Sequence, residues 1–87
     1  GLILEHHGIL TVGRTVAEAF VLMMLVERAA QVQIAAMAAT GARPLVVTDE
    51  VAERTYRQWV GDGKTPEGVD EWPALLRSLD DPAFTNP

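Results

Sequence analysis

The sequence predicts an α/β fold, which within these residues alone amounts to α+β: a β-hairpin followed by one long and two shorter helices. Three observations lead to this prediction. Two short apolar runs flank a segment with a glycine near the N-terminus. A helix-capping pattern then opens a long, alanine-rich stretch. The remainder divides into two shorter helical stretches, separated by segments that contain glycine and proline.

The hairpin is predicted from apolar residues at positions 2–4 and at positions 9, 10 and 12, on either side of Glu5-His6-His7-Gly8. Apolar runs separated by a short segment with a glycine are typical of paired strands. We expect Gly8 to be a turn glycine with positive φ, because it lacks a Cβ atom and adopts that conformation without steric strain.

The long helix is predicted to begin at Thr15-Val16-Ala17-Glu18, which matches a capping box, and to run to about Ala39 before Gly41 closes it. Such a helix is roughly 36 Å long at 1.5 Å per residue. Residues 20–26 are apolar all round, so we expect burial on most sides. A chain this short can hardly provide that burial, which indicates packing on material outside this chain or on another subunit.

The second helix is predicted to follow Thr48 as its N-cap and to run to about Val60, with Gly61 as its stop. An extended connection at residues 43–47 precedes it, and Pro44 blocks continuation of the long helix.

The third helix is expected at residues 70–79, with Pro73 in its first turn. Its apolar side chains recur at helical spacing and form one face. That face consists of Trp72, Leu75, Leu76 and Leu79. Asp80-Asp81-Pro82 is expected to end the helix.

Composition limits the possible partners. The 87 residues suffice for one small domain, with a folded surface of roughly 5,000 Å². The net charge is −5 and the basic residues are scattered, which argues against nucleic acid and anionic membranes as partners. The absence of cysteine excludes disulfides, thiolate zinc clusters and a cysteine nucleophile, and is consistent with a cytoplasmic protein.

Membrane insertion is not expected either. The longest uninterrupted apolar run, residues 19–26, is far shorter than the about 20 residues that a spanning helix needs. The first residues do not form a signal peptide. They have the apolar pattern of a β-strand and are not preceded by an initiating Met, so we expect the chain to be a segment of a longer protein.

The histidine pair His6-His7 is the strongest candidate for chemistry. Neighbouring side chains of a strand point to opposite faces, so one metal ion could take both only if the chain bends sharply between them. Glu5 and His7 would share a face in a regular strand. A catalytic zinc has three protein ligands, whereas the local sequence offers at most two. A surface hairpin with two hydrogen-bonded histidines is the alternative.

Other candidate sites each have an ordinary structural explanation that we favour. Gly13-Arg14-Thr15 could bind an anion, but a turn and helix cap explains these residues. Asp49, Glu50 and Glu53 could form an acidic cluster, but a solvated first turn of a helix explains them. Tyr56 and Trp59 near Arg57 could form the edge of a small-molecule site, but packing in a core or interface explains them. The Met23-Met24-Leu25 segment is expected to be helix core.

Nearly the whole chain resembles the class II aldolase/adducin family. The resemblance lies in the ordered strings LILEHHGILTVGRTVAEAF at residues 2–20, LVERAA at 25–30 with Gln33, and EWPALLRSLDDP at 71–82. The family pattern is an apolar strand, Asn-His-Gly, a second strand, Gly, a Thr or Ser cap and Glu-Ala-Phe. The chain would then be the C-terminal segment, residues 1–87, of a single domain with a three-layer α/β/α architecture.

The resemblance implies a divalent metal, usually zinc, held by three histidines. His7 matches the family's Asn-His-Gly histidine and is the metal ligand that we carry over. His6 stands where the family has Asn, so no ligand role passes to it. The other two ligands, an acidic proton-transfer group and most contacts to a substrate phosphate lie upstream in the family. No catalytic residue is therefore assigned within this chain.

The function implied is that of a zinc-dependent lyase acting on a small hydroxy-carbonyl or sugar-phosphate substrate, similar to fuculose-phosphate aldolase. The metal would polarise a carbonyl and stabilise an enediolate. The isolated chain would be inactive, and the parent is expected to be a homo-oligomer, specifically a tetramer. The alternatives are a non-catalytic, adducin-like interaction module, or a family epimerase, dehydratase or decarboxylase.

Overall fold

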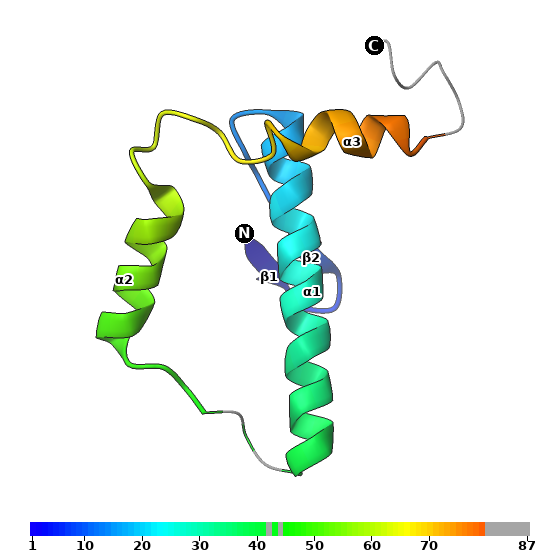
Figure 1. Ribbon diagram of the computed structural model, residues 1–87. Coiled ribbons are helices and arrows are strands. Elements are labelled where there is room, and N and C mark those ends of the chain that lie inside the picture. Colours follow the sequence, from blue (N-terminus) through cyan, green and yellow to red (C-terminus); the bar gives the residue numbers. More distant parts are fainter. Residues whose placement is uncertain (42, 44, 80–87) are drawn as a thin grey trace. The chain divides into compact units, whose positions relative to one another are not determined.

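A computed structural model of the chain describes residues 1–41, 43 and 45–79. The elements follow in the order β1 (Leu2–Leu4), β2 (Gly8–Leu10), α1 (Val16–Thr40), α2 (Asp49–Val60) and α3 (Glu71–Arg77) (Figure 1). The predicted hairpin and three helices are confirmed. The chain divides into two compact units, one formed by Gly1–Leu25 with Pro66–Pro87 and the other by Val26–Thr65.

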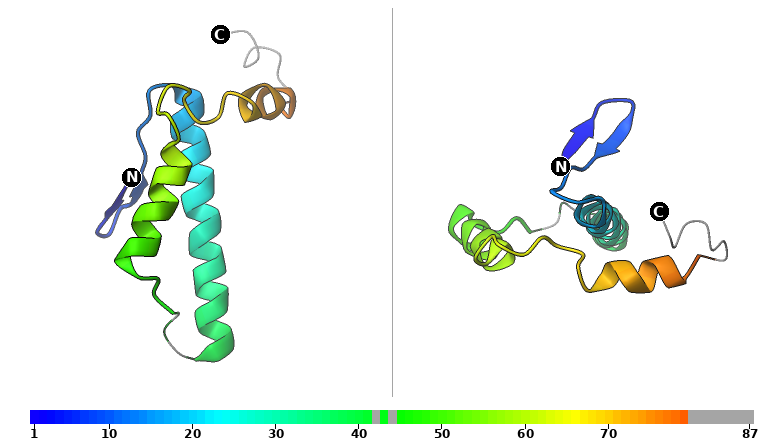
Figure 2. Two further views of the ribbon diagram at one scale, coloured as in Figure 1. Left: turned by 60° about the vertical axis from the view of Figure 1, so that its left-hand side comes forward. Right: turned by 90° about the horizontal axis from the view of Figure 1, so that it is seen from above.

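The hairpin pairs β1 and β2 in antiparallel register, with Ile3 opposite Ile9 and Leu4 opposite Gly8 (Figure 2). The backbone N–H of His7 donates to the carbonyl of Leu4 at 3.1 Å and closes the turn. Gly8 has φ 138°, as predicted. His6 also has a positive φ, 61°, which the sequence did not suggest because histidine is an uncommon residue in this conformation.

Helix α1 begins and ends at the signals found in the sequence. The hydroxyl oxygen of Thr15 accepts a hydrogen bond from the Glu18 N–H at 3.0 Å, which is one half of the capping box. At the other end, Gly41 has φ 63° and its N–H donates to the carbonyl of Met37 at 2.9 Å. A glycine in the left-handed conformation is a common helix terminator because it carries no Cβ.

The core of the first unit lies where the first turns of α1 meet the start of α3 and the segment before it. Val21 is 7% exposed, and the rings of Phe20 and Trp72 pack edge to face with centroids 5.6 Å apart. Gly68 is buried against α1, where an added Cβ would lie 2.7 Å from the carbonyl oxygen of Ala17. These contacts join segments that are far apart in the sequence.

The described residues do not bury residues 20–26 on most sides, in agreement with the expectation that so short a chain can hardly provide that burial. Only Val21 is buried in this stretch, while Phe20 is 46% and Leu25 37% exposed. The other residues of the stretch are half-buried. The second half of α1 is more open still, with Val32 70% and Ile34 68% exposed. The described residues therefore do not cover the apolar surface of this helix.

Helices α2 and α3 agree with their predicted signals. Thr48 caps α2 by accepting a hydrogen bond from the Val51 N–H at 3.3 Å, and the N–H of Gly61 donates to the Arg57 carbonyl at 3.1 Å. Pro73 lies in the first turn of α3. Of the predicted α3 face, Leu79 is exposed and the other three side chains are half-buried. The predicted roles of Pro44 and of Asp80-Asp81-Pro82 lie outside the described residues.

By length and composition alone, the segment Val16–Ala39 of α1 is apolar enough to cross a membrane, and it is the one such helix among the described residues. The length of uninterrupted apolar runs does not reveal this property. The mean hydropathy over the helix does, because it includes the many alanines between the polar residues. The core helix of a soluble protein meets the same criterion, so the expectation that membranes are not partners stays a prediction.

Candidate functional site

The two histidines lie in the turn between β1 and β2, and both are exposed. His6 occupies the third position of a turn from Leu4 to His7, where a type II turn requires positive φ. Within the part of the chain that the structure describes, the His7 imidazole has no hydrogen bond or ion pair. The turn therefore presents an imidazole that is open to a ligand from outside.

The expected relation between Glu5 and His7 is corrected by the structure. Glu5, His6 and His7 form the turn and do not belong to a regular strand, so Glu5 and His7 do not share a strand face. The Glu5 carboxylate instead contacts the Nε2 atom of His6 at 3.3 Å, with both side chains almost fully exposed. This contact contributes little stability because solvent screens it.

The turn does not form a complete metal site by itself. Among the described residues, no group of three or more His, Cys, Asp or Glu side chains lies close enough to hold an ion. A catalytic zinc requires three protein ligands. Among the described residues, the only ligand that fits the predicted metal is the imidazole of His7.

The most highly organised polar group is the carboxylate of Glu18, which is 8% exposed. It accepts hydrogen bonds from the backbone N–H of Arg14 at 2.9 Å and from the Arg14 guanidinium at 3.2 Å. It also accepts one from the backbone N–H of Glu67 at 2.8 Å, 49 residues further along the chain. The capping box had suggested a bond back to Thr15, whereas the carboxylate reaches Arg14 and Glu67.

Hydrogen bonds from the backbone and side chain of Arg14 lower the pKa of Glu18 below its ordinary value of 4.5. Burial opposes this effect in part, and the Glu67 N–H adds a smaller lowering of the pKa. A lowered folded-state pKa means that the ionised carboxylate stabilises the fold fully above pH 4.5. This contribution is lost as the pH falls below 4.5 through the lower folded-state value.

We therefore expect Glu18→Gln to lower the urea midpoint of unfolding at pH 7, and to reduce the further loss of stability between about pH 5 and pH 3. Glu27→Gln on the same helix is the control, because Glu27 is exposed and bonds only to Gln31. Equal midpoints for the Glu18→Gln and Glu27→Gln variants at pH 7 would show that Glu18 does not hold the segment around Glu67.

The anion site considered at Gly13-Arg14-Thr15 is filled from within the chain. The Glu18 carboxylate binds both the backbone and the side chain of Arg14, where an external anion would bind. An added Cβ at Gly13 would lie 2.7 Å from the Ala19 nitrogen, so this glycine permits a close approach to α1. The favoured interpretation as a turn and helix cap is thus supported.

The acidic side chains of α2 form a solvated face. Glu50 pairs with Arg54 at 3.2 Å, and Glu53 pairs with Arg57 at 3.0 Å. Both pairs join residues four positions apart and lie in solvent. The side chains of Tyr56 and Trp59 are also exposed, at 62% and 49%. The packing expected for these two rings is thus not provided by the described residues.

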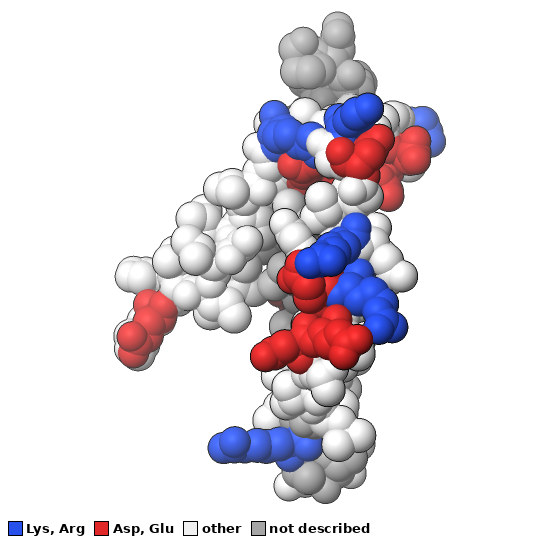
Figure 3. All heavy atoms as spheres, turned by 90° about the vertical axis from the view of Figure 1, so that its left-hand side faces the viewer, with Lys and Arg blue, Asp and Glu red and all other residues white. Residues whose placement is uncertain are grey.

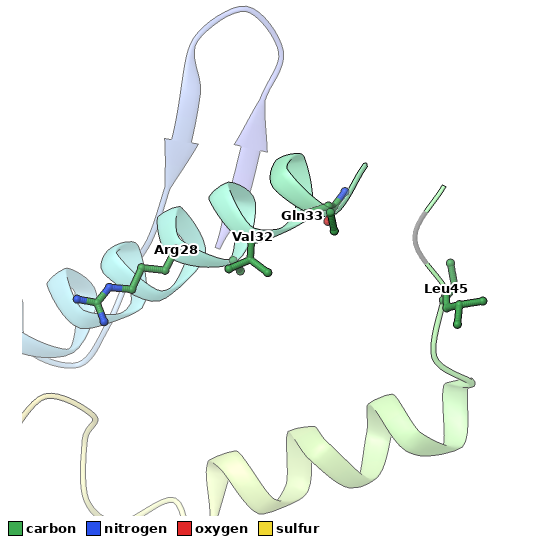
Figure 4. Close-up of a pocket in the computed structure, with 7 residues that line it drawn as sticks. Arg28, Val32, Gln33 and Leu45 are labelled. Atoms are coloured by element: carbon green, nitrogen blue, oxygen red, sulfur yellow. The ribbon is translucent and has the colours of Figure 1, made fainter. Parts of the chain in front are cut away.

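An open hollow occurs in the second unit, between α1 and the segment that precedes α2 (Figure 4). Its lining is mainly apolar and contains no histidine or carboxylate. The lining residues are Arg28, Ala29, Val32, Gln33, Ala36, Leu45 and Val46. Without an acid, a base or a group of metal ligands, this hollow is not a candidate catalytic site.

Comparison with known proteins places this turn and the start of α1 in a known family. Residues 1–34 match the model of the class II aldolase and adducin N-terminal domain. The chain belongs to the class II aldolase/adducin family. The matched class II aldolase/adducin segment contains both strands, His7, the Glu18 carboxylate and α1 as far as Ile34.

Similar class II aldolase/adducin proteins occur in bacteria and animals. A "putative aldolase class 2 protein" of Caulobacter vibrioides is 37% identical over 91% of this chain, and one of Pseudomonas aeruginosa is 34% identical over the same share. Human beta-adducin is 32% identical over 91% of the chain. The chain spans 30%, 31% and 12% of these three proteins, respectively. No solved structure matches it significantly.

Proposed function

We propose that the protein containing this chain is a zinc-dependent lyase that cleaves or forms a carbon–carbon bond in a small hydroxy-carbonyl or sugar-phosphate substrate. In this proposal the chain is the C-terminal segment of a three-layer α/β/α domain, and it is inactive alone. The proposal fits the bacterial relatives, which are named as class 2 aldolases.

The observation that carries the proposal is the exposed His7 imidazole in the hairpin turn of the segment that matches the family. Neutral imidazole nitrogen is a common zinc ligand. Positive φ at His6 and the hydrogen bond between His7 and Leu4 define the backbone that carries this imidazole. The remaining ligands and the proton-transfer group would have to come from residues outside this chain.

A non-catalytic interaction module is the second candidate, and the similarity to beta-adducin favours it. The exposed apolar side chains on α1 and α2 are also consistent with a protein that acts by binding other proteins. An epimerase, dehydratase or decarboxylase with the same metal would require the same His7 ligand and differ in its products.

The proposed parent is a cytoplasmic homotetramer that binds neither nucleic acid nor membranes. The exposed apolar surface of α1 supports association with further protein. Glu27 and Arg28 occupy the middle of the segment that is apolar enough to span a bilayer. Charges at the centre of a bilayer cost several kcal/mol each, which favours a protein partner for this helix over lipid.

The proposal is tested on the intact protein, by its zinc content and by product analysis with a panel of sugar phosphates and small hydroxy-carbonyl compounds. We expect about one zinc per chain and cleavage of at least one substrate into two carbonyl-containing products. An epimer, a dehydrated product or carbon dioxide would identify one of the other metal-dependent reactions. Protein with no zinc and no turnover would support the adducin-like module.

A further inference from the structure

The connection between β2 and α1 is held against the first turns of α1 at three successive points. The hydroxyl of Thr11, the residue that follows β2, donates to the Ala19 carbonyl at 2.8 Å. The backbone N–H of Arg14 donates to the Glu18 carboxylate at 2.9 Å. Between these two bonds, an added Cβ at Gly13 would lie 2.8 Å from the Glu18 Cβ. The path by which the chain leaves the hairpin is therefore fixed by α1.

The hairpin has little packing of its own that would fix its direction relative to α1. Ile9 is half-buried, and the other residues of β1 and β2 are exposed. Charge does not fix the direction either, because Glu5 is the one Asp, Glu, Lys or Arg among residues 1–13 and most of the hairpin surface is uncharged (Figure 3). Of the side-chain hydrogen bonds that the structure describes, the one that joins the chain to α1 nearest to the hairpin is that of Thr11.

A small change at Thr11 is amplified at the His7 turn. An extended strand rises about 3.3 Å per residue, so the four residues from Thr11 to His7 form an arm of roughly 13 Å. A rotation of this arm by about 10° at Thr11 would move His7 by roughly 2 Å. That displacement is as long as a zinc–nitrogen bond, and a functional site tolerates only about 0.5 Å.

We propose that Thr11 is a positioning residue for the His7 imidazole and acts through its hydrogen bond to Ala19. This inference rests on the proposed function, in which His7 is a zinc ligand. The bond does not compete with the helix, because a carbonyl oxygen has two lone pairs and can accept the Thr11 hydroxyl beside its helical partner. The Glu18 carboxylate supports the same connection, because it joins the Arg14 N–H to the Glu67 N–H.

The first test compares Thr11→Val with Thr11→Ser in the intact protein. Valine keeps the branched shape that suits extended backbone but removes the donor, whereas serine keeps the donor. We expect Thr11→Val to weaken zinc binding by at least about tenfold, measured by competition with a chelator, because groups that support metal ligands contribute about 10- to 100-fold. Thr11→Ser should bind zinc within about threefold of the unchanged protein.

Thr55→Val is the matched control. The Thr55 hydroxyl also donates to a helix carbonyl, that of Val51 at 2.9 Å, but it lies in α2 and in the other unit of the chain. We expect Thr55→Val to leave zinc binding within about twofold. The loss of one hydrogen bond is small against the stability of a domain, so we expect all three variants to fold, which their urea midpoints would show.

Cobalt(II) in place of zinc gives a readout that a loss of stability alone would not change. The visible absorption of protein-bound cobalt(II) reports the geometry of its ligands. We expect Thr11→Val to change this spectrum in the folded protein, and Thr11→Ser and Thr55→Val to leave it unchanged.

The outcomes separate this role from the proposed function. Zinc bound through His7 with unchanged affinity and an unchanged cobalt spectrum in Thr11→Val would overturn the role of Thr11 and leave the proposed function standing. Equal weakening by Thr11→Val and Thr11→Ser would overturn the role of the hydroxyl. Zinc binding unchanged by His7→Ala would overturn the proposed function and, with it, this inference.

Discussion

Replacing His7 by alanine in the intact protein is expected to weaken zinc binding by at least about 100-fold, because the loss of groups that merely support metal ligands already costs 10- to 100-fold. The imidazole of His7 is exposed in the hairpin turn and would supply one zinc ligand directly. The measurement is competitive titration of zinc against a chelator, together with the zinc content of the purified variant.

The matched control is His6→Asn. His6 has φ 61°, and asparagine is among the residues that best tolerate this conformation. The family pattern has Asn at the position of His6, and Asn would meet the same requirement of the turn for positive φ. We expect His6→Asn to retain zinc and to keep the turn. Zinc retained by His7→Ala and lost by His6→Asn would reverse the roles of the two histidines.

Replacing Gly68 by alanine is expected to lower the free energy of unfolding by about 3 kcal/mol, the largest effect on stability in the first unit. Two penalties combine at this position. The backbone has φ 88°, and an added Cβ would lie 2.7 Å from the Ala17 carbonyl oxygen and 3.1 Å from a Val21 methyl group. Neither the backbone of α1 nor the buried Val21 can move away freely.

Gly41→Ala separates the two penalties. Gly41 has φ 63°, but an added Cβ there would meet no atom within 4 Å. Its replacement should therefore cost only about 1 kcal/mol for the positive φ. Urea unfolding of the intact protein provides both values. Equal losses for Gly68→Ala and Gly41→Ala would mean that the close contact between Gly68 and α1 does not exist.

The sequence predicted those parts of the fold that depend on neighbouring residues. Thr48 and Gly61 bound α2 through hydrogen bonds that reach only three or four residues along the chain. The Thr15 cap of α1 is equally local. These signals are readable in a single sequence because the partners of each bond lie within one turn of helix.

The parts that the sequence did not predict depend on distant or missing partners. The bond from the Glu67 N–H to Glu18 spans 49 residues, and no local pattern announces it. The positive φ of His6 could not be predicted, because glycine or asparagine usually marks such a position in a sequence and histidine does not. The burial expected around Phe20 is not provided by the described residues, which agrees with the expectation that it requires material outside this chain.

Only one residue of the candidate site, His7, is proposed from the sequence. Its proposed role as a metal ligand rests on the resemblance of the ordered string from His7 to Phe20 to the family pattern. The structure adds the conformation of the turn but no neighbouring carboxylate or histidine that would complete a zinc site among the described residues. Residue types and spacing within this chain cannot predict ligands that the proposed zinc would take from other residues.

The proposed role of His7 as a zinc ligand is tested most directly by the anomalous scattering of zinc in crystals of the intact protein, measured on both sides of the zinc absorption edge. We expect a strong peak about 2.0–2.1 Å from a ring nitrogen of His7, with further ligands from outside residues 1–87. A zinc peak that His7 does not contact, or one coordinated by His6 in its place, would show that His7 is not the ligand.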